Sequence, residues 1–193
     1  MFNFKIQHPG IVSDYFKKLE ILDFDEACDY IAKLPYKRNS EKENPAIALI
    51  DNCGTCSTKH ASLRKLALEQ GFPEVKLILG IFKMNSEYAP KIKNTLDANH
   101  LSYIPEAHNY LKIHNTYFDF TRVNASYTDF QHLLLDELEI EFDEIATKKV
   151  QLHQNYIKQW IIENQYKLSL TDIWKIREQC IADLQNEIPI NTV

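Results

Sequence analysis

The chain has 193 residues, 45% of them hydrophobic, and a formal net charge of −5. This length suits one domain, or one domain with a helical extension. Its modest acidic charge, without a basic run, argues against a nucleic-acid partner. No apolar stretch reaches the roughly 18 residues that span a bilayer, so we expect no membrane partner. Four cysteines and no signal-peptide pattern at the N-terminus predict reduced thiols and a cytoplasmic location.

The first elements alternate between helix and loop. Residues 24–34 carry apolar side chains at helical spacing, with Asp23 or Asp25 available as a cap, and predict a short helix. Residues 35–45 are polar and predict an exposed loop. The apolar run 46–50 is compatible with a buried strand or with the approach to the next helix, because periodicity cannot separate the two.

The clearest helix covers residues 56–70, where apolar side chains recur at helical spacing. Gly71 stands where a left-handed C-terminal cap belongs, and Pro73 prevents continuation of the helix. Residues 75–82 are almost continuously apolar and predict a strand.

The remaining chain divides into a hairpin and a helical region. Residues 83–104 predict a loop with a short helix, and 106–113 and 117–121 predict two paired strands. From residue 129 onward the pattern is helical. We therefore expect a core over 1–128 and a C-terminal helical extension over 129–193.

Cys56 is the residue whose surroundings point most clearly to chemistry. Gly54 lies two positions earlier and the predicted helix begins at the cysteine, so the pattern is glycine turn, thiol, helix. The unpaired N–H groups and the dipole at a helix N-terminus favour a thiolate. The backbone amide of Cys56 could also bind an oxyanion that forms beside the sulfur.

The hairpin supplies a histidine and a carboxylate. A two-residue loop at His114 and Asn115 would place His108 one diagonal step from Asp119, within reach of a hydrogen bond. A three-residue loop would shift the parity and separate the pair. The opposite face would then carry the core side chains Leu111, Ile113, Phe118 and Phe120.

These residues resemble the motifs of the transglutaminase-like cysteine enzyme family, part of the papain-like thiol group. That family has a glycine two residues before its nucleophile, as at Gly54, and a Gly-x-Pro turn after the helix, as at 71–73. A histidine strand and an Asp-Pro-Thr-like strand follow, matched by His108 and by 119–121. The resemblance covers about residues 46–122.

Three positions depart from the family pattern. His60 stands where the family has a small residue, Asn109 replaces an apolar residue after the histidine, and Phe120 replaces a proline.

The resemblance implies an α+β fold with a transglutaminase-like core. In it a cysteine-bearing helix packs on an antiparallel sheet, and C-terminal helices follow. By resemblance, Cys56 is the nucleophile, His108 the general base and then acid, and Asp119 the residue that orients His108. The substrate would be a peptide, a protein or a small amide, and hydrolysis is preferred to transfer. We expect no cofactor and no metal, since no acidic cluster resembles a calcium loop.

Secondary roles and other readings stay open. Asn52, Tyr110 and His60 are candidates for binding substrate or an oxyanion, although His60 suits a packed helix residue and Tyr110 a half-exposed strand residue. Cys53 and Cys56 also form a CxxC pair, which is typical of thiol–disulfide oxidoreductases.

Two further alternatives concern the same region. Cys53, Cys56 and His60 could hold zinc, with His108 or His114 as the fourth ligand. The chain could equally be an inactive binding module built on an enzyme fold. Cys28 and Cys180 lie on apolar helix stripes and are expected in the core.

Overall fold

The computed structural model describes residues 2–185 and has an α+β fold. Four helices precede the sheet: α1 (Ile11–Lys18), α2 (Phe24–Lys33), α3 (Ile47–Ile50) and α4 (Cys56–Glu69). β1 (Val75–Asn85) leads through η1 (Pro90–Ile92) and α5 (Lys93–Ala98) to β2 (Tyr103–Ile113). The chain continues through β3 (Thr116–Phe118), η2 (Tyr127–Asp129), η3 (Gln131–Leu133), β4 (Leu134–Ile140), α6 (Thr147–Glu163) and α7 (Leu170–Gln185).

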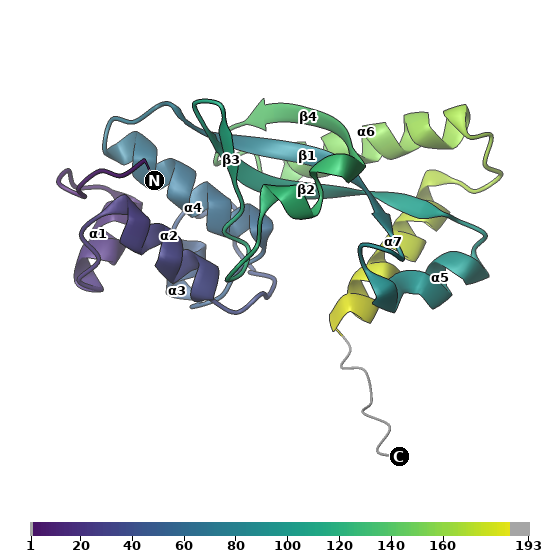
Figure 1. The fold of residues 1–193 in the computed structure, drawn as a ribbon, viewed down its shortest axis with the longest axis horizontal. Coiled ribbons are helices and arrows are strands. Elements are labelled where there is room, and N and C mark those ends of the chain that lie inside the picture. Colours follow the sequence, from purple (N-terminus) through teal and green to yellow (C-terminus); the bar gives the residue numbers. More distant parts are fainter. Residues whose placement is uncertain (1, 186–193) are drawn as a thin grey trace, which may run out of the picture.

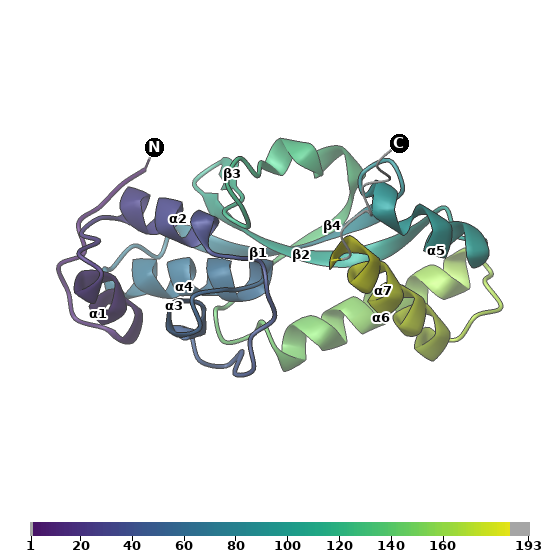
Figure 2. The same ribbon diagram turned by 90° about the horizontal axis from the view of Figure 1, so that it is seen from below.

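The strands form one antiparallel sheet in the order β3-β2-β1-β4. Helices α1 to α4 gather at one end of the molecule and α5 to α7 at the other, with β1 and β2 running between them (Figures 1 and 2). The alternation of side chains along β1 divides the interior into two cores. Leu77 and Leu79 pack with the N-terminal helices, whereas Ile78 and Phe82 pack with α6 and α7.

The N-terminal predictions are largely confirmed. Helix α2 begins after Asp23, whose carboxylate accepts a hydrogen bond from the backbone N–H of Glu26, and α4 begins at Cys56. Gly71 adopts a φ of 83°, which the predicted left-handed cap requires. The ambiguous run 46–50 proves to contain the short helix α3.

The prediction of helix from residue 129 onward is wrong for one segment. Leu134 and Leu138 have helical spacing among good helix formers, but residues 134–140 form β4 and pair with β1. Strand β1 is buried along most of its length, and its edge beside β4 needs a hydrogen-bonding partner. Pairing in the sheet therefore overrides the local preference. α6 and α7 form as expected after the strand, and Ser169 caps α7 by accepting a hydrogen bond from the backbone N–H of Asp172.

The hairpin has the predicted two-residue loop. Ile113 pairs with Thr116 and Leu111 with Phe118, but the ladder ends there. Residues 119–121, which were expected to continue the strand, leave the sheet instead. The edge of β2 at His108 therefore has no strand partner on the β3 side within residues 2–185.

No helix in residues 2–185 is both long and apolar enough to cross a bilayer. The division at residue 128 stays a prediction.

Candidate active site

Cys56 occupies the first position of α4 because the preceding turn packs tightly. A Cβ atom at Gly54 would stand 2.8 Å from Thr58 Oγ1 and 3.3 Å from Ala48 Cβ, so the turn requires glycine. The backbone N–H of Thr55 donates to Thr58 Oγ1, which closes the first turn of the helix. Cys56 is 6% exposed, and its thiol reaches the wall of a cavity.

His108 and Asp119 lie together, as the hairpin parity predicts. His108 Nε2 is 2.8 Å from Asp119 Oδ2, which leaves Nδ1 as the ring nitrogen available to the thiol. Asp119 is held in place because its other oxygen accepts a hydrogen bond from the backbone N–H of Thr121. The contact forms although β3 ends at Phe118, because Asp119 is the first residue after the strand and its side chain still reaches His108.

His60 is a fully buried link between α4 and the segment that follows β3. Its Nε2 accepts a hydrogen bond from the backbone N–H of Phe120 at 2.8 Å, so its proton resides on Nδ1 and is donated to the carbonyl oxygen of Cys56. Burial is the main reason why the pKa of His60 falls to about 4. His60 lines neither cavity beside the thiol, in accordance with a hydrogen-bonded helix residue.

The thiol and His108 favour a charged pair. Burial would raise the pKa of Cys56, but the cations Lys149 and His108, together with hydrogen bonding to His108, outweigh it and lower the pKa to about 6. Burial likewise disfavours charge on His108, yet Asp119 and Cys56 raise its pKa to about 10. A thiolate and an imidazolium are therefore the stable forms near neutral pH.

A polar network that the sequence did not reveal joins the thiol to α6. Lys149 Nζ donates to Ser57 Oγ and to Asn109 Oδ1, each at 2.7 Å. Ser57 also donates to Asn109 Oδ1, and the Asn109 amide donates to the carbonyl oxygen of Ile78. A lysine in the first turn of a helix opposes the helix dipole and is a weak sequence signal. Asn109 stands out only as a departure from the family pattern.

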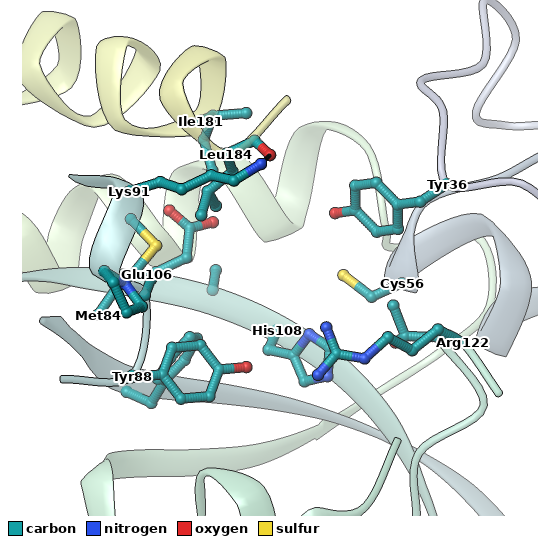
Figure 3. A pocket seen from close by; sticks show the side chains of 15 residues that line it. Tyr36, Cys56, Met84, Tyr88, Lys91, Glu106, His108, Arg122, Ile181 and Leu184 are labelled. Carbon is teal, nitrogen blue, oxygen red and sulfur yellow. Dashed lines mark hydrogen bonds between the residues drawn. The ribbon is translucent and has the colours of Figure 1, made fainter. Parts of the chain in front are cut away.

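Tyr36 comes from the loop predicted to be exposed and contributes its hydroxyl to the site. The loop pairs with the glycine turn: Gly54 N–H donates to Pro35 and Lys37 N–H donates to Gly54. Tyr36 is 54% exposed, but its hydroxyl points into the cavity (Figure 3). The thiolate of Cys56, and next the enclosure of the hydroxyl in the cavity, raise the pKa of Tyr36 well above its usual range, so the hydroxyl keeps its proton.

Asn52 and Tyr110 make their side-chain hydrogen bonds with groups other than the thiol. Asn52 is exposed in the turn before Cys53, where its side-chain oxygen accepts a hydrogen bond from Tyr30. Tyr110 is fully buried, so the prediction of a half-exposed strand residue is wrong, and its hydroxyl donates to Glu137 on β4. Neither residue lines the cavities that border Cys56.

The thiol opens into a cavity of about 460 Å³ between the two ends of the molecule. Tyr36 and Cys56 face Ile181, Leu184 and Lys91 across it (Figure 3). Its wall is mainly apolar, with contributions from β1, η1 and α7. Other lining residues are Phe82, Met84, Tyr88, Ala89, Pro90 and Arg122.

The other cysteines are all free thiols. Cys28 and Cys180 are buried in the two cores, as predicted. Cys53 is 8% exposed, and its carbonyl accepts a hydrogen bond from Asn39. No group of three or more His, Cys, Asp or Glu side chains within residues 2–185 is arranged to hold a metal ion.

Comparison with known proteins gives no match: no family model, no curated protein and no solved structure is significantly similar to this chain.

Proposed function

We propose that the protein is a transglutaminase-like thiol hydrolase or acyltransferase that acts on a peptide or carboxamide bond. One observation supports this above all. A thiol at the N-terminus of α4 stands beside a histidine whose far nitrogen binds a carboxylate, in the order Cys56, His108, Asp119. The cavity next to Cys56 is large enough for a side chain and its flanking groups.

In the acylation step, the Cys56 thiolate attacks the carbonyl carbon and an S–C bond forms. The carbonyl electron pair moves to oxygen, where the backbone N–H of Cys56 and the Tyr36 hydroxyl are available as donors. The C–N bond then breaks, and His108 gives its proton to the leaving nitrogen.

In the second step, water gives a proton to His108 as its oxygen attacks the thioester. The S–C bond breaks, the acid leaves, and thiolate and imidazolium are restored. An amine in place of water would give transfer instead. Asp119 keeps Nδ1 of His108 directed to the sulfur in both steps.

An acylation experiment tests this function with a small activated ester that reacts without specific substrate-binding contacts. The protein is mixed with p-nitrophenyl acetate, and the release of p-nitrophenolate is followed together with the mass of the protein. We expect a burst of one equivalent and one acetyl group on Cys56, lost on addition of hydroxylamine. Cys53→Ser should retain the burst, and His108→Ala should lose at least about 100-fold in acylation rate.

Two outcomes would contradict the proposal. Acetylation spread over several lysines, without a burst, would mean that Cys56 is not an activated nucleophile. A burst lost in Cys53→Ser, with a reversible disulfide between Cys53 and Cys56, would favour a dithiol oxidoreductase.

A further inference from the structure

A second, smaller cavity of about 190 Å³ borders the thiol on the side of α6. Tyr36, Cys56 and Glu106 line both cavities, so the thiol stands where the two meet. A substrate whose reacting carbonyl reaches the thiol would therefore extend in two directions. The larger cavity is lined mainly by apolar side chains, and the smaller cavity by charged ones.

Cations outnumber carboxylates in the smaller cavity. Its lining includes four cationic side chains, Arg38, Lys42, Lys149 and Arg177, and two carboxylates, Glu106 and Glu178.

Both carboxylates are already engaged by arginines. Arg177 makes two hydrogen bonds to Glu106, from Nε at 2.7 Å and from Nη2 at 2.5 Å. Glu178 lies between Arg177 and Arg38, which donates to it at 2.9 Å. These ion pairs leave Lys42 and Lys149 without a carboxylate partner of their own, although the Cys56 thiolate and Glu106 favour the charge on Lys149.

Lys149 and Lys42 form no ion pair with a carboxylate in the described part of the chain. Lys149 donates to two neutral oxygens, those of Ser57 and Asn109, and an ammonium has three N–H donors. Both lysines are half-buried. Burial lowers the pKa of Lys149, the Cys56 thiolate and Glu106 act against this, and repulsion by Arg177 and Lys42 adds to the lowering. A bound anion would relieve this repulsion and give the ammonium a charged acceptor.

We propose that the smaller cavity binds a carboxylate of the substrate next to the bond that Cys56 attacks. The inference rests on the proposed function and names its substrate class: an amide with an acidic group on one side of the reacting carbonyl and an apolar group on the other. Lys149 and Lys42 bind the carboxylate, and the apolar group occupies the larger cavity.

The test compares two alkylating reagents that differ in charge. Iodoacetate and iodoacetamide both react by thiolate attack on carbon, with formation of an S–C bond and loss of iodide. A change in the thiol pKa alters both rates, so their ratio isolates binding of the carboxylate. We expect the iodoacetate rate to saturate with concentration, and the ratio to fall about tenfold in Lys149→Met and in Lys42→Met.

Two variants of equal charge change serve as controls. Lys148 precedes Lys149, is exposed and pairs with Glu144 outside the cavity, and Arg122 lines the larger cavity. Lys148→Met and Arg122→Leu should keep the parent ratio. The Lys42→Met variant keeps the test decisive if Lys149→Met does not fold, because Lys42 lies in a loop.

Protection experiments distinguish the source of the carboxylate. Acetylglycine presents a terminal carboxylate, and the α-amide of acetylaspartate presents only a side-chain carboxylate. Slower alkylation of Cys56 with either compound supports the site and identifies the source. The carboxylate site would be overturned if the ratio of the iodoacetate rate to the iodoacetamide rate were the same in the parent, Lys42→Met and Lys149→Met. It would also be overturned if Arg122→Leu lowered this ratio as much as the lysine variants do. Slow reaction of Cys56 with iodoacetamide would instead overturn the proposed nucleophile.

Discussion

Asp119 contacts two histidines that carry different charges. Its Oδ2 binds His108 at 2.8 Å, and its Oδ1 lies 3.5 Å from Nε2 of His60. His108 is protonated because the carboxylate and the thiolate outweigh its burial. His60 stays neutral because it is fully buried and its Nε2 already accepts the N–H of Phe120. One carboxylate can therefore orient a charged histidine while a neutral histidine holds the backbone beside it.

The neutral state of His60 predicts a pH dependence of stability. Its pKa is about 4 in the folded chain and about 6.5 when unfolded, so the unfolded state binds more protons between these values. The free energy of unfolding should therefore fall as the pH drops from 6.5 to 4, with a contribution from His60 of about 3 kcal/mol. Urea denaturation at several pH values measures this loss.

The matched variant is His60→Gln, which keeps an amide that can donate and accept. It is less stable at pH 7, but its free energy of unfolding should decline less steeply toward pH 4. The same decline in parent and variant would show that His60 does not take up the proton.

At the scale of elements, helix α7 is fastened to the sheet by a buried ion pair. Arg177 binds Glu106 on β2, and their side chains are only 14% and 10% exposed. The same arginine reaches Glu178, which Arg38 binds from the loop before α3. This series of ion pairs joins the loop, α7 and β2 around the smaller cavity.

Removing Arg177 or Arg38 from this series of ion pairs should lower the free energy of unfolding by unequal amounts. Arg177→Gln leaves the Glu106 carboxylate buried without its partner, at a cost of about 3–5 kcal/mol in the free energy of unfolding. Arg38→Gln breaks a pair that is 53% and 39% exposed and should cost at most about 1 kcal/mol. Chemical denaturation of both variants measures the difference. Equal losses would contradict the assignment of Glu106 as a buried charge that depends on Arg177.

At the scale of the whole molecule, the site lies between the N-terminal helices at one end and helix α7 at the other. The N-terminal helices contribute Cys56, the hairpin contributes His108 and Asp119, and α6 contributes Lys149. The sheet fixes these elements in position because β1 and β2 pair over their whole length.

Local patterns in the sequence were sufficient for part of this arrangement. The turn at Gly54 and the cap at Gly71 delimit α4, and the two-residue hairpin loop fixes the parity that brings His108 to Asp119. Each of these features depends on a few neighbouring residues, so the sequence carries the information directly.

Long-range packing explains what the sequence did not reveal. Residues 134–140 have the composition of a helix and become β4 only because β1 offers an edge. Lys149 lies 92 positions from Ser57, and Arg177 lies 71 positions from Glu106, so no spacing rule links them. Tyr110 is buried because β4 and the segment after β3 cover it.

The pKa of the Cys56 thiol tests the central claim most directly. The rate of alkylation by iodoacetamide, measured at Cys56 from pH 4 to 10, should rise with a midpoint near 6 in the parent. In His108→Ala, the midpoint should move upward toward the ordinary cysteine value of about 8.5. A parent midpoint at the ordinary value, unchanged by His108→Ala, would contradict the account.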